Sequence, residues 1–452
     1  MPYRSPQIAN RQQLTDHGQQ ALRGDALDVI EAGLRAADPY RAAKALLRLE
    51  GDMLTVGDRH YDLRRWNAVY VIGAGKASQP IALALEETLG ERISAGVLAV
   101  KRGEEHLLRH IRLIDAAHPV PDAESCRAAG EMLRIAHQAQ AGDIVFAVIT
   151  GGSSALAVYP AEGVSLEDKQ ALNRVLLECG ASIREINAVR KHVSRIKGGR
   201  LAQAVFPAEL INLTVSDVVG DPLDYITDLT VPDTSTWEDA LRTMHTYHLW
   251  DRVPASICRV IEERQGGETP KAFDHPYHTF LLVDGDALCR AAAERCQQLG
   301  YAVDILTRAM EGECSAQAAA FADHAKQRYA HAPAGSRIAL IAGGETTVTL
   351  DQASGRGGPN QEFALCAAQY VEEGEALVIA AVDADGSDGP TDAAGGLVDG
   401  STQRRAREKG CDLHQALRTH DSYTLLEATG DLIFSGPTGT NVNDLMLALM
   451  AR

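Results

Sequence analysis

A glycine-rich turn that carries a lysine is the first stretch of this chain whose residue types could do chemistry. Residues 68–72 form an apolar run typical of a buried strand, and Gly73-Ala-Gly75-Lys76 follows directly. Pro80 and the apolar residues after it predict a helix, so the turn should lie at a helix N-terminus, where an anion is favoured. We therefore expect Gly73 and Gly75 to bind an anionic cofactor and Lys76 to contact it.

Two familiar phosphate-binding motifs do not fit this turn. In the dinucleotide fingerprint G-x-G-x-x-G, the third glycine would stand at Ser78, and the next strand, 95–100, ends in Lys101-Arg102 instead of an acidic residue for the ribose. A P-loop would need G-x-x-x-x-G-K-[ST], which is absent. The turn therefore predicts an anion site of another kind, and the alternative is an ordinary turn with a solvated lysine.

A second strand–glycine–helix turn follows the most apolar run of the chain, residues 143–150. It combines backbone N–H donors with two hydroxyl groups, which suits a phosphate or carboxylate. The alternative is a serine that caps an ordinary helix. We predict that the cofactor is bound by Gly151, Gly152, Ser153 and Ser154.

Basic residues crowd the stretch from Arg184 to Arg200. In a chain with a formal net charge of −17, such a cluster would supply the local positive field that an anion needs. About half of these cations could instead complement a helix dipole. We assign Lys191 and Lys197 to cofactor binding. Asp217 joins them, because an acid at the carboxyl end of a strand (210–215) is placed to bind a metal or a hydroxyl group.

The second half of the chain carries an arginine and several aspartates in glycine-rich loops. Arg356, among the glycines of 355–358, is placed like a clamp on a transferring phosphoryl group, although a solvated loop arginine is the alternative. The loop 383–392 follows a buried strand and does not have the EF-hand order. Its oxygen-rich composition suits Mg²⁺ that also binds substrate phosphates, and Asp385 and Asp388 are the predicted ligands.

The bulk properties favour a cytoplasmic enzyme with a small-molecule substrate. A chain of 452 residues suggests two or three domains, and the polar segment 265–270 is the best linker candidate. The net charge argues against nucleic acid and anionic membranes as partners. Signal-peptide and membrane-span patterns are absent, and the eight cysteines lack a C-x-x-C pair. His106 and His110 lack a third ligand and predict a surface helix, not a zinc site.

A series of motifs, in order along nearly the whole chain, resembles the glycerate 2-kinase family, some members of which are called hydroxypyruvate reductase. In the first half these are Gly-Ala-Gly-Lys-Ala (73–77), Thr-Gly-Gly-Ser-Ser-Ala-Leu (150–156), the basic stretch 186–202 and Ser-Asp-Val-Val-Gly-Asp (216–221). In the second half they are Gly-Gly-Glu-Thr-Thr-Val (343–348), Gly-Arg-Gly-Gly-Pro-Asn-Gln-Glu (355–362), the aspartate loop 385–395 and Gly-Pro-Thr-Gly-Thr-Asn-Val-Asn-Asp (436–444).

The resemblance implies an α/β fold of two domains with the active site in the cleft between them. A large Rossmann-like three-layer domain would span residues 1–265, and a smaller α/β domain of the MOFRL type would span 266–452. A last helix is expected to pack back on the first domain. A homo-oligomer is left open.

The resemblance also implies an activity, the transfer of the ATP γ-phosphoryl group to the 2-hydroxyl of D-glycerate with Mg²⁺. Lys76 and Arg356 match the family's basic catalytic positions, one from each domain. Asp388 completes the expected catalytic set, since Asp385 or Asp388 would orient Mg²⁺ or accept the hydroxyl proton. Substrate contacts are expected from Glu345, Asn360, Thr438 and Asn441.

Three acidic residues depart from the family pattern near the expected cleft: Asp228, Asp284 and Asp383. Because they add negative charge, a related hydroxy acid or sugar acid is an alternative substrate. Two further alternatives are an NAD(P)H-dependent hydroxypyruvate reductase, against which the missing third glycine and ribose acid speak, and a non-catalytic metabolite binder.

Overall fold

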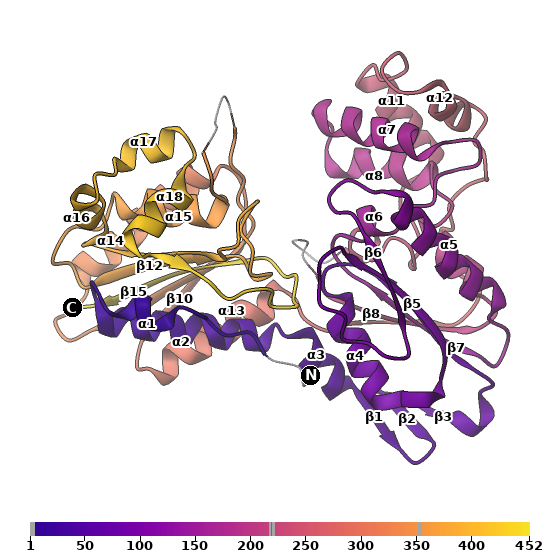
Figure 1. The fold of residues 1–452 in the computed structure, drawn as a ribbon, viewed down its shortest axis with the longest axis horizontal. Helices are drawn as coiled ribbons and strands as arrows, with labels where there is room; N and C mark the ends of the chain where they lie inside the picture. Colours follow the sequence, from indigo (N-terminus) through magenta and orange to yellow (C-terminus); the bar gives the residue numbers. More distant parts are fainter. Residues whose placement is uncertain (1–4, 217, 219–221, 351–354) are drawn as a thin grey trace. The chain divides into compact units, whose positions relative to one another are not determined.

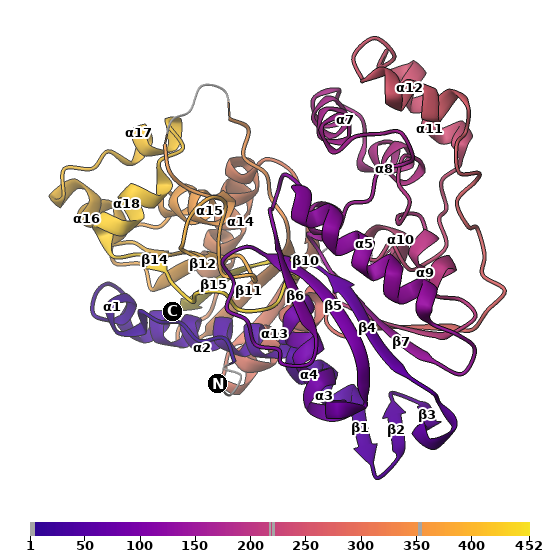
Figure 2. The ribbon, with the colours of Figure 1, turned by 45° about the vertical axis from the view of Figure 1, so that its right-hand side comes forward.

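The computed structural model describes residues 5–216, 218, 222–350 and 355–452, and it confirms the predicted α/β fold (Figure 1, Figure 2). The chain forms two compact units. We call Pro39–Val215 with Asp221–Leu282 the parallel-sheet unit, and Met1–Asp38 with Ser216–Gly220 and Val283–Arg452 the mixed-sheet unit. This division differs from the predicted boundary at 265/266, since the N-terminal segment joins the second half of the chain.

The parallel-sheet unit is built on six parallel strands in the order β6-β5-β4-β7-β8-β9. β4 and β7 are central, and all their residues are buried, as expected for continuous apolar runs. Three short strands form a separate antiparallel sheet. The strands are β1 Leu47–Glu50, β2 Met53–Val56, β3 Arg59–Asp62, β4 Val69–Ala74, β5 Ile93–Lys101, β6 Arg112–Ala116, β7 Ile144–Ile149, β8 Glu209–Thr214 and β9 Tyr277–Leu281.

Helices cover both faces of this sheet, which gives the predicted three layers (Figure 2). α5 and α9 pack over alternate strand residues such as Ile72 and Val145, while α4 packs against β4, β5 and β7. Four further helices, α7, α8, α11 and α12, share a core around Trp237. The helices are α3 Pro39–Leu46, α4 Ser78–Leu89, α5 Ala123–Gln138, α6 Ser153–Leu156, α7 Leu166–Glu178, α8 Ile183–His192, α9 Arg200–Val205, α10 Leu223–Ile226, α11 Trp237–Thr246 and α12 Ala255–Glu262.

Local side-chain caps explain where several helices begin. Ser182 and Glu185 form a capping box at the start of α8, which satisfies backbone N–H groups that have no partner within the helix. By contrast, the surface helix predicted at His106 and His110 does not form. The backbone N–H of His110 donates to the buried carboxylate of Glu86 (2.9 Å), so a tertiary contact fixes this segment in an irregular conformation.

The mixed-sheet unit has the strand order β10-β11-β15-β12-β13-β14, in which only the β10–β11 pair is parallel. α2 and α13 pack on one face and α14, α15 and α18 on the other (Figure 1). The strands are β10 Ala302–Met310, β11 Arg337–Gly344, β12 Leu377–Val382, β13 Gly395–Asp399, β14 Leu432–Ile433 and β15 Asp444–Ala451. The helices are α1 Arg11–Thr15, α2 Gln20–Ala36, α13 Gly285–Gln298, α14 Cys314–His331, α15 Pro359–Ala368, α16 Thr402–Glu408, α17 Leu413–Arg418 and α18 Ser422–Thr429.

The last residues of the chain form a strand, and the predicted last helix is wrong. A last helix was expected there, packed on the first domain, but Asp444–Ala451 is β15, a central strand of the mixed sheet. Its Leu, Met and Ala residues favour helices in isolation. Because β11 and β12 pair with it on both sides and its residues up to Met450 are buried, tertiary pairing overrides that propensity.

A buried ion cluster joins the N-terminal helix α2 to the rest of the mixed-sheet unit. Arg23, fully buried, donates from Nε to Asp399 (2.6 Å) and from Nη2 to Asp431 (2.7 Å). Arg405 donates to both oxygens of Asp431 (2.7 Å each). Two arginines thus face two aspartates, and this pairing places residues 5–38 with the second half of the chain. In the described part of the chain, no helix is long and apolar enough to cross a membrane.

Candidate active site

The strand order of the parallel sheet identifies a place for ligand binding. From β4 the chain moves outward through β5 and β6, and it then returns to the other side of β4 to add β7, β8 and β9. The carboxyl ends of β4 and β7 are therefore the point where the strand order reverses, which is where open α/β sheets bind ligands. Lys76 follows β4, and the turn 151–154 follows β7, so both predicted turns meet at this point.

Close packing between these turns explains their glycines. A Cβ atom on Gly73 would lie 2.3 Å from the carbonyl oxygen of Val148, and one on Gly75 would lie 2.1 Å from Thr150 Oγ1. The N–H of Lys76 donates to Gly151 O (2.9 Å). The N–H groups of residues 75, 77 and 78 also bond within the protein, to Ala99 O, Thr150 Oγ1 and Gly75 O.

The backbone of the first turn is therefore not open to an anion, contrary to the expectation from the sequence. Gly73 and Gly75 are required by the approach of β4 to β7, and the cradle of free N–H groups that we expected at them is not present. What the turn presents is the half-buried side chain of Lys76.

Two residues that the sequence did not single out lie beside Lys76. A Cβ atom on Gly152 would lie 3.3 Å from Lys76 Cγ and 3.4 Å from His118 Nε2, so Gly152 separates these two side chains. Burial raises the pKa of Glu104 to about 7, and the charge of Lys76 acts in the opposite direction. Glu104 thus titrates near neutral pH close to Lys76, and perturbed carboxyl groups of this kind are common at catalytic sites.

The second turn contacts one of the cations that were assigned with it to cofactor binding. Lys197 Nζ donates to Ser154 Oγ (2.8 Å) and to Asp228 Oδ2 (2.8 Å), and the lysine is only 4% exposed. Ser154 is exposed and Ser153 is buried. The departure from the family pattern at Asp228 therefore does not leave an unpaired carboxylate, because Lys197 neutralises it.

Lys191 has a different environment. Its Nζ donates to Asp233 (2.9 Å) and to Asp224 (3.3 Å), and it lies 5.4 Å from the centre of the Tyr225 ring. Although burial acts to lower it, these carboxylates raise the pKa of Lys191. Its charge is thus already compensated within the protein, and these ion pairs explain Lys191 without a cofactor.

In the mixed-sheet unit, acidic residues gather at one edge of the sheet. Glu345 follows β11, Asp383 follows β12, and Asp444 begins β15, which runs antiparallel to both. Burial raises the pKa of Asp444 well above its ordinary value, and the charges of Asp383 and Asp388 raise it further. Asp444 was not among the predicted site residues, because only the sheet order brings it to this edge.

The aspartate loop uses its carboxylates to shape the site. Asp388, which is 1% exposed, accepts hydrogen bonds from the backbone N–H of Asn360 (3.0 Å) and of Gln361 (2.8 Å) at the start of α15. Asp385 accepts from Ser387 N–H (2.8 Å), and Thr438 N–H donates to Asp385 O (3.1 Å). The predicted residues Asn360, Asp385, Asp388 and Thr438 therefore do lie together.

These contacts do not fit a metal ion held by the protein. Both oxygens of Asp388 are bonded to N–H groups, and the described residues contain no group of three His, Cys, Asp or Glu side chains placed to hold a metal. Mg²⁺ that binds mainly through nucleotide phosphates would not need such a group. No catalytic step is therefore assigned to an ion at Asp385 and Asp388.

Arg356 is held by its neighbours in the mixed-sheet unit. Its guanidinium lies 3.6 Å from the centre of the Tyr423 ring and donates to Asp392 (2.9 Å). Tyr423 Oη donates to the same Asp392 oxygen (2.9 Å). About half of the Arg356 side chain is exposed (51%), and only one of its N–H groups is used by Asp392.

The remaining predicted residues lie in different parts of the chain. Asn441 and Glu345 lie in the described mixed-sheet unit, whereas Asp217 lies outside the described residues. Lys76 and Arg356 belong to different units, each described by itself.

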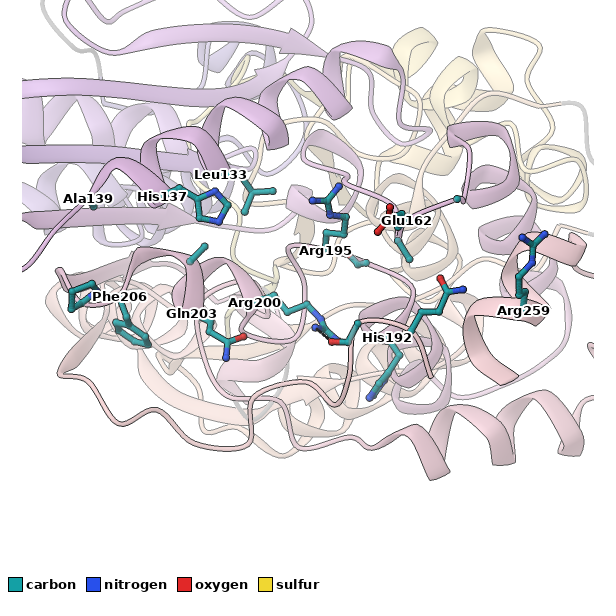
Figure 3. Close-up of a pocket in the computed structure, with 17 residues that line it drawn as sticks. Leu133, His137, Ala139, Glu162, His192, Arg195, Arg200, Gln203, Phe206 and Arg259 are labelled. Carbon is teal, nitrogen blue, oxygen red and sulfur yellow. Dashed lines mark hydrogen bonds between the residues drawn. The ribbon is translucent and has the colours of Figure 1, made fainter. Parts of the chain in front are cut away.

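A cavity of about 1050 Å³ in the parallel-sheet unit was not predicted (Figure 3). Arg195, Arg200 and Arg259 line it, together with His192 and Phe206. None of the predicted site residues that the structure describes is among its lining residues. Arg200 donates to the carbonyl oxygens of Gly266 and Gly267 (2.8 Å each), which makes it a support for the wall of this cavity.

Comparisons with known proteins agree along nearly the whole chain. Residues 25–262 match the family model "Domain of unknown function (DUF4147)", and residues 338–444 match the MOFRL family. A glycerate 2-kinase of Pyrococcus horikoshii is 42% identical over 94% of this chain and 98% of its own length. The human glycerate kinase is 32% identical over 95% of this chain and 93% of its own length. The crystal structure of a Thermotoga maritima glycerate kinase matches with a TM-score of 0.83 and 37% identity, covering 96% of this chain and 100% of that one.

Proposed function

The chain belongs to the glycerate 2-kinase family, and from that membership we propose that it transfers a phosphoryl group from ATP to the 2-hydroxyl of D-glycerate, giving 2-phosphoglycerate. The observation that carries the proposal is the position of Lys76. It follows β4 at the reversal of the strand order and lies against Gly152 of the second turn. A ligand at this point would meet Lys76, Ser154 and Lys197.

Phosphoryl transfer requires positioning and charge neutralisation more than covalent chemistry by the protein. The Lys76 ammonium would neutralise an oxygen of the moving phosphoryl group or of the glycerate carboxylate. The exposed Ser154, in the second turn after β7, offers a hydroxyl donor that Lys197 orients. Mg²⁺ would arrive with ATP and supply charge neutralisation between its phosphates.

Arg356 is the second cation that we assign to the reaction. For this role its guanidinium would donate its remaining N–H groups to a ligand oxygen or exchange Asp392 for that oxygen. The exchange is plausible in energy, because an exposed ion pair contributes only about 0–1 kcal/mol. An oxyanion that accepts two parallel hydrogen bonds from the guanidinium would replace this contact.

Asp228 and Asp284, two departures that raised doubt about the substrate, have structural partners. Asp228 pairs with Lys197, and Asp284 caps α13 by accepting a hydrogen bond from the N–H of Ala287 (2.7 Å). These contacts support glycerate over a substrate chosen by additional carboxylates in the site.

The test is the release of ADP with D-glycerate, measured in a coupled assay on wild type, Lys76→Met and Arg356→Ala. We expect a loss of roughly 10²–10³-fold in kcat for Lys76→Met, the size seen when one charge-stabilising donor is removed. Lys44→Met is the matched control, since Lys44 lies on α3 and pairs only loosely with Glu87 (3.5 Å). Turnover that is unchanged in both site variants would contradict these roles.

The alternative activities separate in the same assay series. Oxidation of NADH or NADPH with hydroxypyruvate, followed by absorbance, would show a reductase. Nucleotide binding without turnover on any hydroxy acid or sugar acid would show a binding protein. Turnover that is faster with another hydroxy acid than with D-glycerate would move the substrate assignment and leave the kinase assignment intact.

A further inference from the structure

The side-chain amino group of Lys169 on α7 is buried and has no carboxylate partner among the described residues. It is 3% exposed, and its Nζ donates to the backbone carbonyl oxygen of Arg190 (3.3 Å). No carboxylate oxygen among the described residues lies within 4.0 Å of it. Burying a charge without a partner is costly, and replacing it with an apolar residue would remove that cost. A buried lysine in this state calls for a function.

Other cations surround Lys169. Lys197, 4% exposed, follows α8, and Arg190, half-buried, lies within it and donates from Nε to Asn173 Oδ1 (3.1 Å). The negative charge of Asp228 acts to raise the pKa of all three basic groups. Of the three, only Lys197 donates a hydrogen bond to it. Three basic groups thus share one acidic group, so the cluster holds an excess of positive charge inside a chain whose net charge is −17.

The cluster reaches the surface through Ser154. The Lys197 ammonium bonds to the exposed Ser154 hydroxyl on one side and to buried Asp228 on the other. Ser154 belongs to the turn after β7, at the reversal of the strand order. An anion that enters at this turn would meet Ser154 first and then Lys197, whose charge acts on Lys169.

We propose that Ser154, Lys197, Arg190 and Lys169 form a pocket for a phosphate group, and that Lys169 takes up a proton when the phosphate binds. In the protein without an anion, burial and the charges of Arg190 and Lys197 disfavour the ammonium form of Lys169. A phosphate adds negative charge, which favours the ammonium form of Lys169 and allows a charge-assisted hydrogen bond. The identity of the phosphate, as a group of the phosphoryl donor or of the phosphorylated product, rests on the proposed function.

The charges that act on Lys169 support this assignment. Burial lowers the pKa of Lys169 well below its usual range, and Arg190 and Lys197 lower it further, while Asp228 alone opposes them. Burial also lowers the pKa of Lys197 and of Arg190. The positive charges of Lys169, Lys197 and Arg190 therefore disfavour one another until an anion is present.

The experiment is calorimetric titration of the full-length protein with sulfate. Sulfate resembles phosphate in shape and charge but carries no proton at neutral pH, so any proton uptake comes from the protein. Measurement in buffers with different ionisation enthalpies gives the number of protons bound per sulfate. We expect uptake of roughly one proton by wild type, and an affinity that falls as the pH rises.

Lys169→Met should bind sulfate roughly tenfold or more weakly and without this proton uptake, because the variant loses a charged donor. Lys44→Met should behave as wild type in both measurements. A second variant, Lys169→Arg, keeps a permanent charge, so it should bind sulfate without proton uptake. Unchanged affinity and unchanged proton uptake in Lys169→Met would overturn the proposal, as would the absence of proton uptake in wild type.

Two arms identify the phosphate. Competition of sulfate with a non-hydrolysable ATP analogue assigns the pocket to the phosphoryl donor, and competition with 2-phosphoglycerate alone assigns it to the product. Binding of sulfate without either competition overturns the link to the reaction. If D-glycerate is not phosphorylated but proton-coupled sulfate binding is lost in Lys169→Met, the proposed function fails and the pocket stands.

Discussion

Arg23 in the mixed-sheet unit and Lys169 in the parallel-sheet unit are both buried cations, yet their surroundings differ in charge balance. Arg23 bonds to Asp399 and Asp431, and with Arg405 the cluster contains two arginines and two aspartates. Lys169 bonds to a carbonyl oxygen, and with Arg190 and Lys197 it faces the single carboxylate of Asp228. Burial alone therefore does not distinguish the two sites.

The difference in balance indicates a difference in role. A buried cation with matched carboxylates holds elements together, as Arg23 holds α2 to the strands and loops of its unit. A buried cation in a group with excess positive charge weakens the protein until a ligand supplies the missing charge, and perturbed groups of this kind concentrate at functional sites. The comparison predicts that the free energy of unfolding falls when Arg23 is replaced and rises when Lys169 is replaced.

The largest effect is expected from Arg23→Met. The substitution leaves Asp399 and Asp431 buried with one cation fewer, so we expect the free energy of unfolding to fall by about 3–5 kcal/mol. Urea denaturation measures it. The control is Arg11→Met, which removes a pair between partly exposed Arg11 and Asp28 and should cost no more than about 1 kcal/mol. Equal losses in the two variants would remove the distinction between matched buried pairs and surface pairs.

Lys169→Met should have the opposite sign. Replacing a buried, uncompensated amino group, whose proton is disfavoured in the folded state, by an apolar side chain of similar length is expected to raise the free energy of unfolding by about 1–3 kcal/mol. The same variant should lose activity, which separates a binding role from a structural one. A clear destabilisation in urea would show that Lys169 is a packing residue like Arg23.

The stability gain in Lys169→Met should also depend on pH. In the folded protein the pKa of Lys169 lies below its ordinary value of 10.5, so the unfolded chain binds more protons between the two values. The free energy of unfolding of wild type therefore rises with pH in this window. The variant has no lysine at this position and lacks this pH-dependent contribution. We expect the difference between them to shrink as the pH approaches 10.5, measured by urea denaturation at several pH values. A difference that is constant with pH would contradict a lowered pKa of Lys169 in the folded protein.

Glu104→Gln should give the smallest effect and tests the same idea with a carboxylate. Its pKa of about 7 in the folded protein exceeds the ordinary 4.5, so the folded state binds more protons between these values. Wild-type stability should fall as the pH rises from 4.5 through 7, and above pH 7 the glutamine variant should be more stable by about 1 kcal/mol, since partial exposure screens the effect. Thermal unfolding of both proteins at pH 5 and pH 8 measures the change. Parallel curves at the two pH values would place Glu104 in contact with water.

Much of the parallel-sheet unit follows from local sequence. Continuous apolar runs predict β4 and β7, the glycines after them predict sharp turns, and parallel strands bring both turns to one edge of the sheet. The neighbourhood of Lys76 and the turn 151–154 was therefore predictable. That the backbone N–H groups of the first turn are used internally was not, because their acceptors lie on β5 and after β7.

The sequence by itself determined the α/β class, the turn that presents Lys76, the motif order that shows the family, and the loops that carry Arg356 and Asp388. Only the tertiary structure decided the rest. The Leu-, Met- and Ala-rich chain end became the central strand β15 because two strands pair with it. Lys169, one lysine on a polar helix, became a buried cation because α8 and Asp228 come from other parts of the chain. Burial and charge balance depend on such distant partners, and local patterns do not report them.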